Sequence, residues 1–326
     1  ASFSQIENLA ALMRIFNVWC MLTAASALKF ASRLSLRRHI SSRSLSMSEN
    51  HFEYLVIGAG SGGMASARRA AGYGAKVGVV ERGPLGGTCV NVGCVPKKVM
   101  WNAASVMEMI HESSNYCFNT NGETTFDWKA LKDKRDKYIL RLNGIYGRNL
   151  DNSKVKVLHG AASFSGEKEV MVNGEKYTAD NILIAVGGTP AKPDIPGIEH
   201  AIDSDGFFKL ESQPKRVAVV GGGYIGVELA GVFKALGSET QLFTRGDKIL
   251  RGFDSILVDN LLKAMDKQGL TYNANSNPAK IDKAADGSMT ITTDSGATFG
   301  PFDCVLFATG RRPLVDGLNL GTVGVE

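Results

Sequence analysis

The chain has 326 residues, enough for two domains, and its 44% hydrophobic and 21% charged residues are typical of a globular protein. Its five cysteines are too few and too scattered for a secreted disulfide scaffold, so a close pair is better explained by catalysis. The net charge of +5 arises in residues 21–47, which hold five basic residues and no acid. The other 32 basic residues balance the 32 acidic ones, which gives no support for a nucleic-acid partner.

The N-terminal extension differs in composition from the rest of the chain. Residues 1–20 contain an apolar run that is too short to span a membrane, and Met21 is interpreted as the initiator. Residues 21–46 are rich in Arg and Ser and hold no acid, which is typical of a mitochondrial transit peptide; a disordered basic tail is the alternative. Met47 directly precedes the folded region, so initiation there would add a cytoplasmic form to the mitochondrial one.

The folded sequence begins with a strand, a glycine-rich turn and a helix. Residues 54–57 predict a buried parallel strand, and the pattern G-x-G-x-x-G follows at 58–63 before an Ala- and Arg-rich helix. A second strand at 76–80 ends at Glu81, 23 residues after Gly58. This order predicts a dinucleotide site, because the glycines let the backbone approach a pyrophosphate and Glu81 can accept hydrogen bonds from the ribose.

Two cysteines, Cys89 and Cys94, lie five residues apart in a glycine-flanked segment at 86–98. In an undistorted helix five residues rise about 7.5 Å, whereas a disulfide needs its Cα atoms within roughly 4.4–6.8 Å. The pair can therefore close only if the helix is bent, and Gly93 and Pro96 are residues that bend it. A strained dithiol of this kind indicates a redox-active pair rather than a structural disulfide.

The middle of the chain alternates between helices and strands and then repeats the nucleotide pattern. Helices are expected at 101–111, 127–150 and 255–268, and strand-rich sequence at 154–177, 182–186 and 287–294. The second nucleotide pattern has a strand at 216–220, glycines at 221–223 and 226, a helix and a strand at 240–243. The segment 303–313 resembles the turn at 183–190 and is expected to return the chain to the first domain.

The position after the second nucleotide strand carries a base where the first pattern carries an acid. Arg245 lies 24 residues after Gly221. A guanidinium suits a 2′-phosphate, so the second nucleotide is predicted to be NADP(H) rather than NAD(H). Arg251, six residues on, would add a second charged contact. The alternative is that both are ordinary surface arginines.

Two dinucleotide patterns and one dithiol indicate an electron relay, in which NADPH reduces a flavin, the flavin reduces the disulfide, and the dithiol reduces an external substrate. The predicted fold class is α/β, with two Rossmann-like dinucleotide-binding domains, the second inserted in the first. The predicted division is an extension at 1–46, an FAD-binding domain with the redox disulfide at 51–187, an NADPH-binding domain at 188–313, and the start of a return to the FAD domain at 314–326.

The segments 58–63, 86–98, 221–228 and 308–313 resemble the pyridine nucleotide-disulfide oxidoreductases, and the resemblance covers residues 51–326. Within that family the chain is most similar to the NADPH-dependent glutathione-disulfide reductases, on the segments 64–69, 98–102 and 141–146. The resemblance implies FAD and NADPH as cofactors, glutathione disulfide as substrate and a homodimeric full-length protein. It implies no metal ion, no nucleic acid and no membrane.

The resemblance also implies roles for the residues of the dithiol segment. Cys94 would be the charge-transfer thiol beside the flavin, and Cys89 the interchange thiol that forms a mixed disulfide with glutathione. Lys97, on the same helical face as Cys94, would favour the thiolates, lie near the flavin ring and pair with Glu228. Tyr224 would cover the nicotinamide pocket.

Further contacts are implied for both cofactors and for the substrate. The implied FAD contacts are Gly58, Gly60, Ser61, Gly62, Gly63, Glu81, Thr88, Cys89, Lys97 and Ala162. The implied NADPH contacts are Gly221, Gly222, Gly223, Tyr224, Ile225, Glu228, Arg245, Arg251 and Gly310. The implied glutathione contacts are Ser61, Arg68 and Tyr146, of which Arg68 would hold a carboxylate.

The family pattern continues beyond this sequence. Neither its Gly-Asp segment, which holds the flavin side chain, nor its His-Pro…Glu motif is found, and none of the five His residues precedes a Pro. We therefore expect a chain truncated at the C-terminus, without the dimerisation domain and with impaired turnover. Two alternatives stay open, a large-type thioredoxin reductase and a catalytically incomplete nucleotide-binding fragment. Lipoamide dehydrogenases are disfavoured because Arg245 and Arg251 indicate NADP.

Overall fold

The computed structural model describes residues 49–119 and 124–325, all within one unit of the chain, Glu49–Glu326. The predicted transit peptide at 21–46 lies outside the described residues. Among those that are described, no helix has the length and apolar character needed to cross a membrane.

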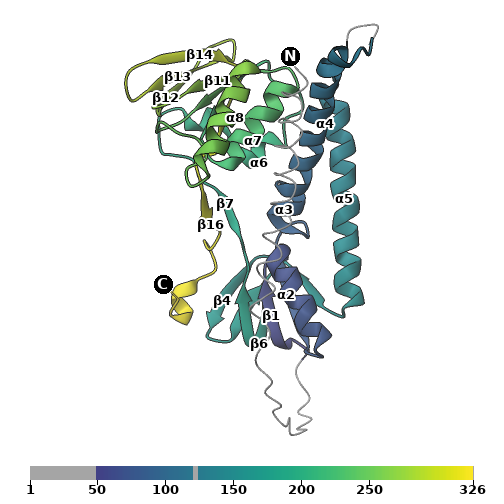
Figure 1. The fold of residues 1–326 in the computed structure, drawn as a ribbon. Helices are drawn as coiled ribbons and strands as arrows, with labels where there is room; N and C mark the ends of the chain where they lie inside the picture. Colours follow the sequence, from purple (N-terminus) through teal and green to yellow (C-terminus); the bar gives the residue numbers. More distant parts are fainter. Residues whose placement is uncertain (1–48, 120–123, 326) are drawn as a thin grey trace. The chain divides into compact units, whose positions relative to one another are not determined.

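The first sheet has six strands in the order β3-β2-β1-β6-β5-β4 (Figure 1). The strands are β1 His51–Ile57, β2 Val77–Glu81, β3 Lys156–His159, β4 Ala162–Gly166, β5 Glu169–Val172 and β6 Glu175–Ile184. β1 pairs in parallel with β2 and with β6, and β4–β5–β6 is an antiparallel extension. The valines and isoleucines of β1 and β2 are buried, as apolar runs in parallel strands predict.

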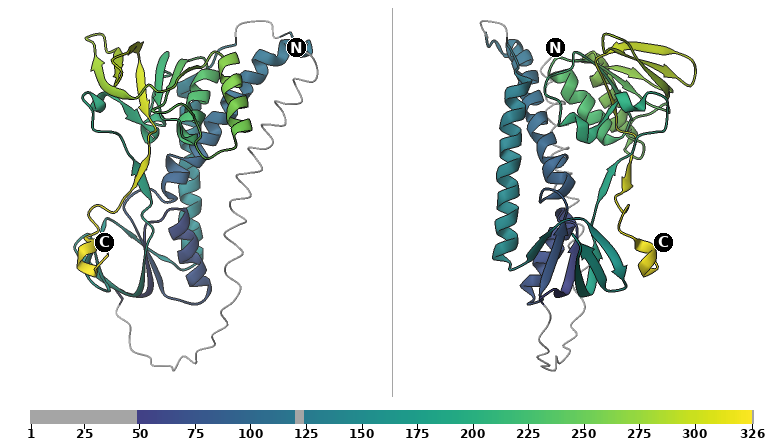
Figure 2. Two further views of the ribbon diagram at one scale, coloured as in Figure 1. Left: turned by 60° about the vertical axis from the view of Figure 1, so that its left-hand side comes forward. Right: turned by 180° about the vertical axis from the view of Figure 1, so that it is seen from behind.

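Four helices accompany this sheet: α2 Ser61–Gly72, α3 Gly87–Asn91, α4 Cys94–Glu112 and α5 Trp128–Asn152. α4 and α5 run side by side, as Figure 2 shows in two further views. α5 begins where predicted, because the Asp127 carboxylate accepts a hydrogen bond from the Ala130 amide at 2.9 Å and caps the helix.

The dithiol segment differs from the single bent helix that its spacing predicts. The chain leaves the helical conformation at Val92 and Gly93 and starts a second helix at Cys94, so the cysteines belong to two helices. Pro96 lies in the first turn of α4. Backbone N–H groups of a first turn make no hydrogen bond within the helix, so proline is tolerated there and does not bend α4. α4 also begins seven residues before the predicted start at 101.

The second sheet has five parallel strands in the order β11-β10-β9-β15-β8. They are β8 Ile202–Asp203, β9 Arg216–Val220, β10 Glu239–Phe243, β11 Thr271–Asn273 and β15 Cys304–Phe307. The helices of this part are α6 Ser204–Phe207, α7 Tyr224–Ala235 and α8 Ser255–Lys267, and a small antiparallel sheet is formed by β12 Pro278–Lys283, β13 Met289–Thr293 and β14 Thr298–Phe302. The predicted fold class, α/β with two parallel nucleotide-type sheets, is confirmed.

Two extended segments join the sheets. β7 Gly188–Pro190 and β16 Arg311–Pro313 pair in antiparallel fashion, with Arg311 opposite Pro190. Beyond β16 the chain reaches the first sheet, where the Phe164 amide donates to the Leu318 carbonyl at 2.9 Å. Leu318 is buried in the core of that sheet. The residue limits predicted for the two domains stay a prediction.

Candidate active site

The first glycine-rich turn joins β1 to α2 so closely that side chains have no room. Gly58 has φ +107°, and a Cβ there would lie 2.4 Å from the Ala185 carbonyl oxygen. A Cβ on Gly63 would lie 1.9 Å from the Gly58 oxygen. The first hydrogen bond of α2, from the Met64 amide to the Gly60 oxygen, leaves the preceding N–H groups without helical partners. Such a helix N-terminus can hold a phosphate.

The second turn, between β9 and α7, repeats this geometry. Gly221 has φ +127°, and a Cβ there would lie 2.4 Å from the Ala308 oxygen. A Cβ on Gly226 would lie 2.0 Å from the Gly221 oxygen. In both turns the amide of the first glycine donates to a carbonyl at or next to the end of the neighbouring strand, Gly58 to Val80 at 2.8 Å and Gly221 to Phe243 at 2.9 Å. The structure therefore contains two turns of dinucleotide-binding shape.

Glu81, at the end of β2, takes part in the first turn directly. Its carboxylate accepts hydrogen bonds from the Ala59 amide at 2.7 Å and from the Gly83 amide at 2.7 Å. The acid thus holds the turn in place from the neighbouring strand. A contact between Glu81 and a ribose stays a prediction.

The two cysteines meet where α3 ends and α4 begins. Both are free thiols, and a hydrogen bond joins their side chains. Gly93 makes this approach possible, because a Cβ at that position would lie 2.8 Å from the Thr88 oxygen and 3.3 Å from the Cys89 Cα. A side chain at position 93 would therefore push the N-terminus of α4 away from α3.

The protein alone does not favour the thiolate that the resemblance implies for Cys94. The pKa of its thiol is raised to about 11, chiefly by burial of the thiol, although the residue as a whole is exposed, and then by the hydrogen bond with Cys89. Lys97 lowers the pKa, as expected, but its effect is the smallest of those acting on this thiol. A thiolate at Cys94 at neutral pH would need stabilisation from outside the chain.

An ion pair connects the dithiol helix with the second nucleotide turn. Lys97 on α4 donates from Nζ to Oε1 of Glu228 on α7 at 2.9 Å, and the two side chains are 23% and 22% exposed. The Lys97 ammonium also lies 5.9 Å from the centre of the Trp101 ring. The structure thus brings together two predicted residues that are 131 positions apart in the sequence.

Two asparagines that the sequence reasoning missed hold the dithiol segment. Asn143 on α5 donates to the Leu85 oxygen at 2.7 Å and to the Asn91 Oδ1 at 3.0 Å. Asn91, at the end of α3, donates to the Gly87 oxygen at 2.9 Å. Asparagine is a poor helix former, so its presence in the middle of the predicted helix could have indicated that the side chain of Asn143 makes a specific contact.

The remaining residues that the resemblance implies as cofactor or substrate contacts take no part in the hydrogen bonds described above. Arg68 on α2 donates from Nε to the Ser153 hydroxyl at 3.1 Å, and Tyr146 packs against the core around β1 and α2. Ala162 is buried in β4, whereas Ile225 is half-buried in α7. Besides Arg68 and Cys94, the exposed members of the predicted set are Ser61, Gly62, Thr88, Gly223, Tyr224, Arg245, Arg251 and Gly310. The roles of all these residues stay predictions.

Two sheets with nucleotide-type turns, and a dithiol whose Cys94 opens the helix that contacts α7, are the features of a dinucleotide-linked dithiol oxidoreductase. The family model described as pyridine nucleotide-disulphide oxidoreductase matches residues 52–326, and the chain belongs to this family.

Two curated relatives carry the name glutathione reductase. The protein from Yarrowia lipolytica (strain CLIB 122 / E 150) is 49% identical over 291 residues, covering 85% of this chain and 62% of the relative. The protein from Schizosaccharomyces pombe (strain 972 / ATCC 24843) is 50% identical over 284 residues, covering 84% of this chain and 61% of the relative. The chain therefore spans about three fifths of the length of these relatives.

Proposed function

We propose that the protein to which this chain belongs reduces glutathione disulfide with NADPH, through FAD and the Cys89/Cys94 pair. The observation that carries the proposal is the 2.9 Å ion pair between Lys97 and Glu228. It connects α4, the helix that begins at Cys94, with α7, the helix that begins at the second nucleotide turn. Glutathione disulfide is proposed as the substrate because both relatives carry the name glutathione reductase.

The residues present fit both cofactors. The first turn, with Glu81 beside it, would hold FAD, because nothing larger than glycine fits at Gly58 and Gly63 and the N-terminus of α2 stays open. The second turn would hold NADPH. When bound, FAD supplies two-electron transfer between NADPH and the disulfide.

Two arginines support NADP over NAD. Arg245 and Arg251 are exposed in the loop that follows β10. The Leu250 amide donates to the Gly222 oxygen at 2.6 Å, which ties this loop to the glycine turn. A 2′-phosphate at the turn would therefore lie within a loop that carries two guanidinium groups.

The chain's own thiols carry out the second half of the reaction. The Cys89 thiolate attacks one sulfur of glutathione disulfide, which releases one glutathione and leaves a mixed disulfide. The Cys94 thiolate then attacks the Cys89 sulfur, releases the second glutathione and closes the Cys89–Cys94 disulfide. The two thiol protons pass to the two glutathiones, so the dithiol is oxidised and glutathione disulfide is reduced.

A half-reaction tests the proposal on the purified complete protein to which this chain belongs. We expect bound flavin by its absorbance, the appearance of two titratable thiols per chain with NADPH under anaerobic conditions, and release of two glutathiones on adding glutathione disulfide. Cys89→Ser should keep flavin binding and release no glutathione. A complete protein that binds no flavin, or forms no thiols with NADPH, would contradict the proposal.

A further inference from the structure

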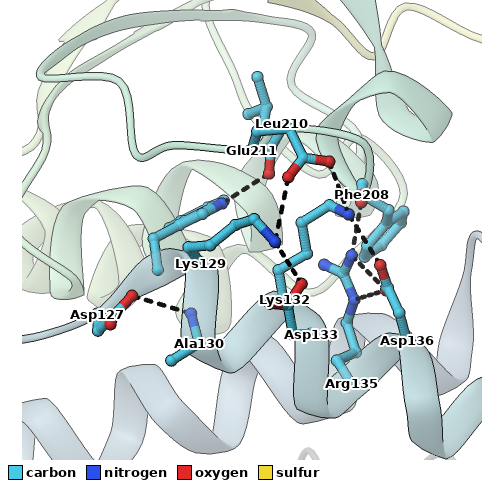
Figure 3. Close-up of polar contacts among 11 residues, drawn as sticks. Asp127, Lys129, Ala130, Lys132, Asp133, Arg135, Asp136, Phe208, Leu210 and Glu211 are labelled. Carbon is cyan, nitrogen blue, oxygen red and sulfur yellow. Dashed lines mark hydrogen bonds and ion pairs between the residues drawn. The ribbon is translucent and has the colours of Figure 1, made fainter.

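A buried guanidinium lies between α4, α5 and the residues after α6 (Figure 3). The side chain of Arg135 on α5 is 1% exposed. Its Nη1 donates to the Met100 Sδ on α4 at 3.7 Å, and its Nη2 donates to the Phe208 oxygen at 2.5 Å. Nε and Nη2 donate to the Asp136 Oδ1 at 2.9 and 2.7 Å. One side chain thus bonds to its neighbour on α5 and to two parts of the chain outside that helix.

The shape of the guanidinium matters here as much as its charge. Its planar fork directs donors in several fixed directions at once, whereas a lysine ammonium is a compact point charge on a flexible stem. The guanidinium carbon also lies 5.5 Å from the centre of the Phe208 ring. An uncompensated buried charge would be costly, so contact with the carboxylate of Asp136 and with the Phe208 carbonyl fixes where Arg135 can lie.

Other side chains of α5 engage the same segment, Phe208–Glu211. Trp128 donates from Nε1 to the Leu210 oxygen at 2.9 Å. Lys132 and Lys129 form ion pairs with Glu211 at 3.0 and 3.6 Å. Figure 3 shows these contacts as a row along α5. Glu211 is 65% exposed, so its ion pairs contribute little, and Arg135 is the buried charged member of the row.

The two residues that Arg135 contacts outside α5 are connected to the helices of the Lys97–Glu228 pair, one to α4 and the other to α7. Met100 is three residues after Lys97, one turn along α4, and it is fully buried. On the other side, Phe208 follows Phe207, whose ring packs 4.9 Å from the ring of Phe233 on α7. Phe233 lies five residues after Glu228 on the same helix.

We propose that Arg135 is a positioning residue, whose fork holds α4 and α7 at the separation that lets Lys97 reach Glu228. The inference rests on the proposed function, since that function gives the pair its place beside flavin and nicotinamide. Arg135 itself contacts none of the predicted site residues through the bonds described above. Its effect is therefore on the distance between two helices.

Competitive acylation of lysines tests this without any cofactor. The purified chain is treated with limiting acetic anhydride, and mass spectrometry gives labelling of Lys97 relative to the adjacent, exposed Lys98. Glu228→Gln, which frees the Lys97 amine, should raise this ratio by about twofold to fivefold, the range of a partly exposed ion pair. Arg135→Lys and Arg135→Gln should each raise the ratio at least halfway to the Glu228→Gln value. If one of them does not fold, the other decides.

The matched control is Lys129→Met, which removes an exposed cation from the same row and should leave the ratio at the wild-type value. A wild-type ratio in Arg135→Lys or Arg135→Gln would overturn the inference. The labelling does not depend on reductase activity. A complete protein without NADPH-dependent thiol formation would therefore contradict the proposed function and leave this inference standing.

Discussion

At the scale of single residues, the dithiol depends on what its neighbours exclude and bury. Gly93 keeps the N-terminus of α4 within reach of α3, because any larger residue would collide with the Thr88 oxygen. The same closeness buries the Cys94 thiol and places Cys89 beside it, and both effects oppose ionisation of Cys94. The positive charge of Lys97 acts in the other direction and is outweighed.

This balance predicts the pH dependence of Cys94 in the cofactor-free, reduced chain. Thiols react with iodoacetamide as thiolates, and the pKa of Cys94 is raised to about 11, so its alkylation rate should still be rising at about pH 10. The rate is measured by mass spectrometry of the Cys94 peptide. Cys89→Ala removes the hydrogen bond and the nearby charge, and should move the profile to lower pH. A wild-type profile that levels off below pH 9 would refute the assignment.

At the scale of elements, α5 supports the site from outside it. Asn143 fixes the backbone of the dithiol segment, and Arg135, two turns earlier on the same helix, bonds to α4 and Phe208. α4 and α7 then meet through Lys97 and Glu228. A helix with no predicted catalytic residue thus helps to position the three helices that carry them, α3, α4 and α7.

Removal of the Asn143 amide tests this support. Asn143→Ala removes the shorter of two hydrogen bonds to the Leu85 carbonyl and the bond to the Asn91 Oδ1, so we expect a loss of about 1–3 kcal/mol in the free energy of unfolding in urea. The rate at which the Cys89–Cys94 disulfide closes under mild oxidation should fall as well. Asn152→Ala, an exposed position at the end of the same helix, is the control. Equal behaviour of the two variants would refute a role for Asn143 in holding the segment.

At the scale of the whole molecule, the same backbone geometry occurs at both glycine-rich turns. Both sheets end a strand at a glycine that has positive φ and no room for a Cβ, and both place the start of a helix there. The two turns differ at the end of the neighbouring strand. Beside the first turn, β2 ends at Glu81, whereas beside the second, β10 is followed by the loop that carries Arg245 and Arg251. The difference predicts two different nucleotides.

Nucleotide preference tests that difference. Arg245→Ala should weaken NADPH binding by about tenfold to a hundredfold, the loss of a hydrogen bond between charged partners, and leave NADH binding nearly unchanged. Isothermal titration with each nucleotide measures both constants. Lys248→Ala, which removes a nearby exposed cation, is the control for general electrostatics. An equal loss for NADPH and NADH would speak against a 2′-phosphate contact.

The local features of this protein follow from its sequence alone. Apolar runs, glycine spacing and the cap at Asp127 act over a few residues, so the strands beside both nucleotide turns, the turns themselves, α5 and the fold class could be predicted, whereas β8, β11 and β12 were not. The spacing of Cys89 and Cys94 indicated a redox pair, although it suggested one bent helix where the structure has two.

Only the tertiary structure decided how the site is held. Burial and pairing arise from residues far apart in the chain, and no local pattern reports them. The contact of Lys97 with Glu228 was expected only from a resemblance, whereas the burial of Arg135, the anchor at Asn143 and the raised pKa of Cys94 were not expected at all. Each depends on which helices pack together, because packing determines which charges lose water and which donors find acceptors.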